Sequence, residues 1–406
     1  MSSMICSSGP LAGRSWGRRV GAALLCLAAT TCAAAAPVTP TDPQQVLEKL
    51  PLRQGGAWSA IRELQAKLAA EPDNARAAAA LAHEYLTLMR QTGEPRLLAY
   101  SHRALARWNG EPDPPASIAL QRALLAQSEH HFAEARAELV RLVAREPGET
   151  EAWLALAAID TVQGRYADAS SSCRRLVLAA DPAITAGCVA ATKTMTREAG
   201  ATYALLAANV ERARTGMSSV SSWLATLAAE TAASLGRDDD ARAHFETALA
   251  ASEPTPDLYL LTAYADFLLR QGHFGEVISL LEAAPPADTV LLRLALAERR
   301  GGRDASEHVA TLRYRLELAL DARDVAHARE AAFLALYLLD EPERALALAL
   351  ANWDVQREAI DARLVIDAAA AAHDPAAAAP VTDWLHQLGT EQSALTRQRP
   401  CCNASF

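Results

Sequence analysis

The clearest architectural signal in this chain lies in residues 151–182, which read EAWLALAAIDTVQGRYADASSSCRRLVLAADP. Apolar residues nearly encircle the segment from Trp153 to Ile159, as expected of a helix that is packed between two neighbours. Gly164 then marks a turn, and Pro182 ends a second apolar stretch. The segment therefore predicts two short helices joined by a tight turn.

Units of this kind recur along the chain at a spacing of about 34 residues. Tyr166 lies 34 residues after Phe132, and Gly272 lies 36 residues after Gly236. A single helical hairpin cannot bury its apolar face alone, so consecutive units must stack on one another. No window of the sequence shows the alternation of β-branched residues that predicts a strand. The fold class predicted is all-α, an α-solenoid of stacked helix–turn–helix repeats.

The repeat resembles the tetratricopeptide repeat (TPR) family. Trp153, Leu156 and Ala157 match the opening of the first repeat helix, and Ala169 matches the small residue of the second helix. Two later units carry part of the same pattern. The resemblance implies a right-handed superhelix of about eight or nine helix pairs, whose concave groove binds a polypeptide segment.

The composition divides the chain into four parts. Residues 1–35 are predicted to be a signal peptide, 36–56 a flexible linker, 57–388 the TPR-like α-solenoid and 389–406 a disordered tail. The clearest repeats lie within 116–286, and Gly200 marks an irregular unit. The repeat region therefore accounts for most of the chain.

The first residues have the layout of a secretory signal. Three arginines precede the short apolar run from Val20 to Ala29, and small residues follow before Pro37. The apolar run is too short to span a bilayer. We expect cleavage before Ala36 and export of a soluble protein to the periplasm or the extracellular space.

A lipoprotein is the alternative form of the exported protein. Cys32 would then carry the lipid and anchor the chain to a membrane. Thr31 and Ala29 fit the usual residues before a lipidated cysteine poorly. Cleavage to a soluble form is therefore favoured.

The charge balance restricts the partner class. The chain holds 39 Lys and Arg against 48 Asp and Glu, a formal net charge of -9. An acidic surface repels phosphate, so nucleic acid is not expected as a partner. A basic or apolar polypeptide segment is expected instead. After signal removal no stretch reaches the roughly 18 apolar residues of a membrane span.

Four cysteines remain once residues 1–35 are removed. Cys173 and Cys188 fall in consecutive antiparallel helices on either side of Asp181-Pro182. Thiols can oxidise outside the cytoplasm, so a disulfide between these two is predicted. Two buried free cysteines that act as small apolar residues are the alternative. The state of Cys401 and Cys402 is left open.

The motifs of common catalytic and metal sites are missing from the sequence. It contains no phosphate-binding glycine loop, no nucleophile elbow and no pair of histidines at metal-binding helical spacing. We therefore predict no catalytic residue, no cofactor and no metal. An enzyme whose site lies on the solenoid outside these motifs is the alternative, because a fold does not fix a function.

The predicted partner site is the concave face around residues 223–270. In the TPR family, positions 2, 5, 9 and 13 of the first repeat helix tend to line the groove, and Gly236 and Gly272 set the register here. The resemblance implies as partner-binding residues Trp223, Thr226, Glu230, Tyr259, Thr262, Asp266 and Arg270. An aromatic, a hydroxyl and an acid thus recur in two consecutive units. The alternative is that the two aromatics only pack between helices.

The function that follows is that of a non-enzymatic scaffold or adaptor. It would bind a polypeptide segment within a cell-envelope, secretion or assembly pathway. The lysines and asparagines that clamp a C-terminal carboxylate in some TPR proteins are missing, so a C-terminal acidic ligand is not expected.

Overall fold

The computed structural model describes residues 56–213, 218–252, 255–321 and 327–389. The predicted signal peptide, Cys32, all but the last residue of the linker, the tail beyond residue 389, Cys401 and Cys402 lie outside these residues.

The described elements are all helical: nineteen α-helices and two short 3-10 helices, with no strand in the described ranges. The first ten α-helices are α1 Gly56–Ala70, α2 Ala75–Thr92, α3 Arg96–Leu105, α4 Ala116–Ser128, α5 Phe132–Arg145, α6 Thr150–Val162, α7 Tyr166–Arg175, α8 Pro182–Ala191, α9 Ala199–Ala213 and α10 Ser218–Ser234. The others are α11 Asp238–Ser252, α12 Leu258–Gln271, α13 Phe274–Leu281, α14 Asp288–Arg300, α15 Ser306–Asp321, α16 Ala328–Leu338, α17 Pro342–Trp353, α18 Ala359–Ala371 and α19 Ala379–Leu388. The 3-10 helices are η1 Ala106–Trp108 and η3 Pro375–Ala378.

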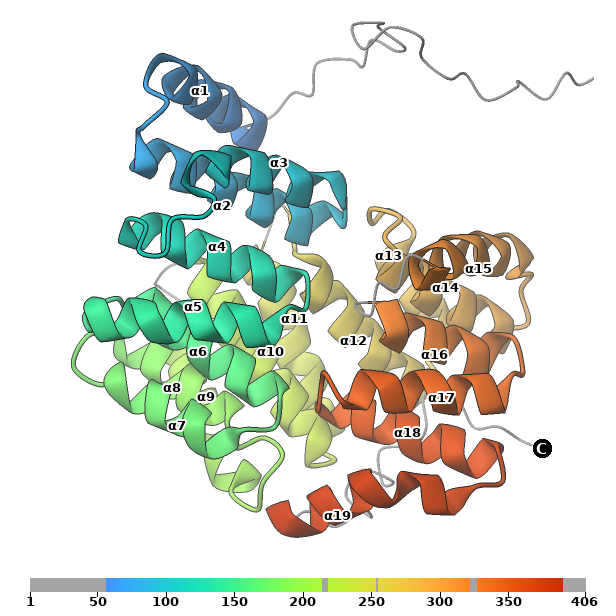
Figure 1. The fold of residues 1–406 in the computed structure, drawn as a ribbon. Coiled ribbons are helices and arrows are strands. Elements are labelled where there is room, and N and C mark those ends of the chain that lie inside the picture. The colour runs from blue at the N-terminus through green and yellow to red at the C-terminus, as the bar shows by residue number, and fades with distance from the viewer. Residues whose placement is uncertain (1–55, 214–217, 253–254, 322–326, 390–406) are drawn as a thin grey trace, which may run out of the picture. The chain divides into compact units, whose positions relative to one another are not determined.

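After α1, the helices form nine consecutive hairpins, from α2–α3 to α18–α19 (Figure 1). The first helix of each hairpin packs against its own partner and against the first helix of the next hairpin. The even-numbered helices therefore form one continuous layer, and the odd-numbered helices cover it. This arrangement confirms the predicted α-solenoid and its eight or nine helix pairs.

A residue in the left-handed conformation ends the first helix of eight of these hairpins. Such a residue closes a helix sharply and leaves room for the chain to reverse. The eight residues are Gly93, His130, Gly164, Gly236, Gly272, Gly302, Asp340 and His373. The α8–α9 hairpin differs, because residues 192–198 connect its helices and Gly200 lies inside α9. The irregular unit predicted at Gly200 is thus a unit with a longer connection.

Alanine forms much of the core. In α10, the side chains of Ala225, Ala228, Ala229 and Ala232 are fully buried. Small side chains allow neighbouring helices to approach closely, which suits a helix that packs against α8, α9, α11 and α12. Larger side chains such as Phe245 fill the spaces between the two layers.

Early and late repeats touch each other directly. The backbone N–H of Arg357 donates to the carbonyl of Val162 at 2.7 Å, and Arg197 donates to the carbonyl of Gly389 at 3.0 Å. A Cβ atom at Gly164 would lie 3.1 Å from the Trp384 ring. The turn at Gly93 likewise contacts the chain just before α14. The solenoid therefore closes on itself, so that the segment before α18 and helix α19 lie against the α6–α9 region (Figure 1).

Candidate functional site

Two of the predicted groove residues meet across neighbouring repeats. The Tyr259 hydroxyl donates to Glu230 Oε1 at 2.7 Å. Glu230 lies in α10 and Tyr259 in the first turn of α12, so the contact joins adjacent first helices. The tyrosine side chain is 56% exposed although its neighbours in α12 are buried. A large aromatic ring is thus presented on the inner layer together with a carboxylate.

Local sequence fixes the position of Tyr259. Asp257 caps α12, and its side chain accepts a hydrogen bond from the Leu260 N–H at 3.0 Å. The cap places Tyr259 in the first turn, while Leu260 and Leu261 turn into the core. Tyr259 is therefore held at the start of a well-anchored helix.

The surrounding repeats limit the solvation of this pair. Burial raises the pKa of Glu230 to about 7. The hydrogen bond from Tyr259 acts in the opposite direction and lowers this pKa, but its effect is smaller. Burial and the adjacent Glu230 carboxylate raise the pKa of Tyr259 well above its ordinary value. The charges of Glu358 and Arg329, which belong to the C-terminal repeats, also act on Tyr259. The charges of the C-terminal repeats therefore reach this pair, whose tyrosine side chain stays 56% exposed.

Three other predicted groove residues are used in packing. A Cβ at Gly187 would lie 2.5 Å from the Trp223 ring, so the half-buried indole packs directly on the backbone of α8. Thr226 and Thr262 are buried, and each hydroxyl donates to a carbonyl one turn earlier in its own helix, both at 2.8 Å. The structure does not bring these three into the open part of the groove.

The last two predicted residues, Asp266 and Arg270, differ in their surroundings. Asp266 accepts two hydrogen bonds from Arg293 of α14, at 2.9 and 2.7 Å, and both residues are buried. This pair joins consecutive repeats. Arg270, in the last turn of α12, is half-buried, and its charge acts on Glu230. This charge favours the ionised form of Glu230 without an ion pair between the two side chains.

A polar cluster centred on Arg329 in α16 is not predicted by any pattern in the sequence. Its guanidinium donates to both oxygens of Asp361 at 2.7 and 2.8 Å, to Glu358 at 2.6 Å and to Gln356 at 2.9 Å. Asn352 also donates to Asp361. The one local signal was the capping box of α18, formed by Glu358 and Asp361. That motif indicates where a helix begins, and it does not predict that an arginine from another helix binds the two carboxylates.

The Arg329 cluster holds the closing segment in place. Gln356 in this segment lies 3.3 Å from His130 Nδ1, at the α4–α5 turn. Its neighbour Arg357 bonds to Val162 at the end of α6. The cluster therefore positions residues 354–358 against two early turns.

The two predicted disulfide partners lie side by side. Cys173 of α7 and Cys188 of α8 are joined by a disulfide with a sulfur–sulfur distance of 2.06 Å, and both are buried. They pack with Ala157 and Leu176 in a small apolar cluster. The bond connects two consecutive hairpins within the early half of the solenoid.

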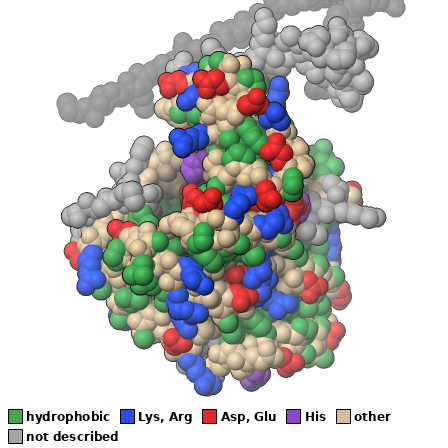
Figure 2. Space-filling model, turned by 60° about the vertical axis from the view of Figure 1, so that its left-hand side comes forward, with side chains coloured by type: hydrophobic (Ala, Val, Ile, Leu, Met, Phe, Trp, Pro, Cys, Tyr) green, Lys and Arg blue, Asp and Glu red, His purple; other side chains and the backbone are tan. Residues whose placement is uncertain are grey.

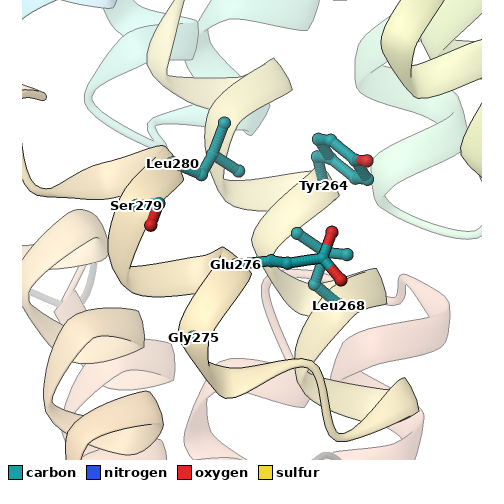
Figure 3. Close-up of a pocket in the computed structure, with 6 residues that line it drawn as sticks. All are labelled: Tyr264, Leu268, Gly275, Glu276, Ser279 and Leu280. Atoms are coloured by element: carbon teal, nitrogen blue, oxygen red, sulfur yellow. The ribbon is translucent and has the colours of Figure 1, made fainter.

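A shallow depression of about 380 Å³ lies between α12 and α13. Figure 3 shows Tyr264 and Leu268 reaching it from α12, and its other lining residues come from α13. Tyr264 lies five residues after Tyr259, and at 100° per residue the two point to nearly opposite sides of α12. Glu276 at its edge is paired with Arg242 at 2.7 Å. The depression is therefore separate from the Glu230–Tyr259 pair.

Neither a metal-binding cluster nor a membrane-spanning helix occurs among the described residues. They contain no group of three or more His, Cys, Asp or Glu side chains placed to hold a metal ion. None of the helices in the described ranges combines the length and apolar character needed to cross a membrane. On the face drawn in Figure 2, acidic, basic and apolar side chains are interspersed.

Comparisons with known proteins find likeness in structure but not in sequence. No family model and no curated protein matches the chain. A Rap protein complexed with competence and sporulation factor has a TM-score of 0.48 and 11% identity, over 84% of this chain and 97% of that one. The Cut9–Hcn1 hetero-tetramer of APC/C has a TM-score of 0.39 and 14% identity, over 77% of this chain and 52% of that one. Yeast Tom70 has a TM-score of 0.37 and 11% identity, over 84% of each chain.

These identities and TM-scores are too low to transfer a partner or an activity to this chain. The chain's own geometry gives the architecture: paired helices, a continuous layer of first helices and a turn residue that recurs about every 35 residues. The described part of the chain is therefore a TPR-like α-solenoid.

Proposed function

We propose that this protein is a non-enzymatic adaptor that binds an extended segment of a partner protein along its concave side. The observation that carries the proposal is the exposed Tyr259 ring, held against Glu230 on the inner layer. Tyrosine is among the residues that dominate binding energy at protein interfaces. An aromatic side chain of this size left 56% exposed on the inner layer supports a binding role.

The form of the groove favours an extended segment over a globular surface. Stacked first helices present an elongated concave surface that a strand-like peptide can follow. Glu358, in the segment 354–358 that is held against Val162, is near enough for its charge to act on Tyr259. A peptide several residues long suits this geometry.

We further propose that the protein acts outside the cytoplasm, in an envelope, secretion or assembly pathway. The layout of residues 1–35 supports export, and the disulfide between Cys173 and Cys188 suits an oxidising compartment. N-terminal sequencing of the mature protein decides the form. A start at Ala36 supports the soluble protein, an acylated Cys32 supports the lipoprotein, and an intact N-terminus on cytosolic protein contradicts export.

Fluorescence polarisation with fluorescein-labelled random nonapeptides tests the binding role. The wild-type chain is expected to bind the library, and Tyr259→Ala is expected to weaken binding by roughly 10- to 30-fold, as for an interface hot spot of about 2 kcal/mol. Tyr314→Ala is the matched control, because Tyr314 is 67% exposed on α15, in the outer layer. An undiminished affinity of a folded Tyr259→Ala variant would contradict the groove assignment.

A further inference from the structure

The buried acids among the described residues share one feature. Each lies against at least one arginine of its own or a neighbouring repeat. These acids are Glu138, Asp160, Asp266 and Asp361. The pattern is expected, because a carboxylate removed from water needs a positive partner or dense hydrogen bonding.

Glu230 departs from this pattern. Its side chain is half-buried, and its hydrogen-bond partner is the Tyr259 hydroxyl, which occupies one of its oxygens. In the described ranges, this carboxylate forms no ion pair: no Lys, Arg or His nitrogen lies within 4.0 Å of its oxygens. A carboxylate offers about four acceptor positions, so most of its hydrogen-bonding capacity is left open.

The nearby arginines do not neutralise this acid. Arg293 is held by Asp266, and Arg329 is shared between Asp361 and Glu358. Two carboxylates on one guanidinium leave a negative charge beside the groove. Arg270 attracts Glu230 from a distance, while Glu358 and Asp266 repel it. Burial raises the pKa of Glu230 to about 7, so a cation beside the carboxylate would favour its ionised form.

We propose that Glu230 and Tyr259 form a subsite for a single lysine or arginine side chain of the bound segment. This assignment rests on the proposed function, since the subsite lies in the same groove. The cationic head reaches the open acceptor positions of the Glu230 carboxylate. The exposed face of the Tyr259 ring supports the apolar stem of the side chain or the cation itself.

Charge favours this occupant over an acidic one. Glu230 and Glu358 both act on Tyr259, and the chain carries a formal net charge of -9. An acidic segment would bring a further carboxylate toward these groups, which is unfavourable at low solvation. The specificity of the groove is therefore for a basic side chain at one position of an extended peptide.

Three nonapeptide libraries that differ at a fixed central residue test this assignment. The central residue is arginine, its neutral isostere citrulline, or glutamate. At pH 8 the wild-type chain is expected to bind the arginine library roughly 10- to 100-fold more tightly than the citrulline library, as for a charge-assisted hydrogen bond. Glu230→Gln is expected to reduce this ratio to near one. Glu246→Gln is the matched control, since Glu246 is exposed on α11, and it is expected to keep the wild-type ratio.

The outcomes separate this inference from the proposed function. If the wild-type chain binds all three libraries equally and Tyr259→Ala still weakens binding, the groove is correct and the cation subsite is wrong. If Glu230→Gln retains the arginine preference, another acid supplies it and the subsite is again wrong. If the wild-type chain binds no library, the proposed function itself fails. Glu230→Arg, checked for wild-type helicity by circular dichroism, is expected to reverse the preference toward the glutamate library.

Discussion

At the scale of single residues, Glu230 couples the groove to pH. Its pKa of about 7 in the folded chain lies above the ordinary glutamate value of 4.5. Between these two pH values the folded state holds a proton that the unfolded state has lost. Stability therefore falls as pH rises from about 4.5 to about 7, and the loss is complete above that window. The charged and titratable groups that face it are Tyr259, Asp266 and Arg270 of α12 and Glu358 before α18.

Glu230→Gln is expected to stabilise the free protein at pH 8 by about 1–2 kcal/mol, because the amide carries no charge to desolvate. The gain is expected to be small at pH 5, where the folded state already holds the proton. Urea unfolding at both pH values measures the difference, with Glu246→Gln as the control for loss of an exposed charge. An equal effect at both pH values would contradict the shifted pKa.

His373 illustrates a second effect of single residues. It ends α18 at a φ of 55°, a left-handed conformation that costs an L-residue energy. His373→Gly is expected to stabilise the chain by about 0.5–1 kcal/mol, since glycine adopts this conformation without steric cost. His373→Ala keeps the strain and is expected to give no gain. Thermal unfolding of the two variants distinguishes them, and equal melting temperatures would exclude the strain argument.

At the scale of elements, the disulfide between α7 and α8 joins two hairpins that would otherwise be held by apolar packing. The two cysteines are 15 residues apart, so the bond is expected to contribute up to about 3 kcal/mol in the loop-entropy model. Cys173→Ala/Cys188→Ala is expected to lower the melting temperature, and a reductant is expected to do so only in the wild type. Peptide mapping without reductant should recover the linked pair. Two freely alkylatable thiols in oxidised native protein would refute it.

At the scale of the whole described solenoid, closure depends on α19. Trp384 of this helix packs on Gly164 and lies 5.1 Å, centroid to centroid, from the Trp353 ring. Trp384→Ala is expected to cost about 1–3 kcal/mol, below the range of a fully buried tryptophan because this side chain is half-buried. Hydrogen exchange is expected to rise at the α6–α7 turn and in residues 354–358. A rise confined to α19, or one matched by the outer-layer control Tyr314→Ala, would show that closure does not depend on Trp384.

Much of the fold could be predicted from the sequence because its signals are local. The spacing of Gly236 and Gly272, and the apolar pattern from Trp153 to Ile159, each lie within one or two hairpins. The turn residues His130, Asp340 and His373 are weaker signals than glycine, since most histidines and aspartates adopt other conformations even though both types are enriched among non-glycine residues at left-handed positions. The repeat register placed Glu230 and Tyr259 on the same face, and the structure brings them into contact.

The local pattern of residues is therefore enough to define the repeat: two helices, a tight turn, and the position of each residue within the unit. Which of those positions are open depends on packing between repeats. Trp223 packs against Gly187, and Arg293 holds Asp266, although the repeat register predicts both in the groove. Closure is likewise a tertiary result, since Val162 and Arg357 are joined across 195 residues. The curvature of a solenoid accumulates from small rotations between consecutive repeats, so no local pattern of residues encodes their sum.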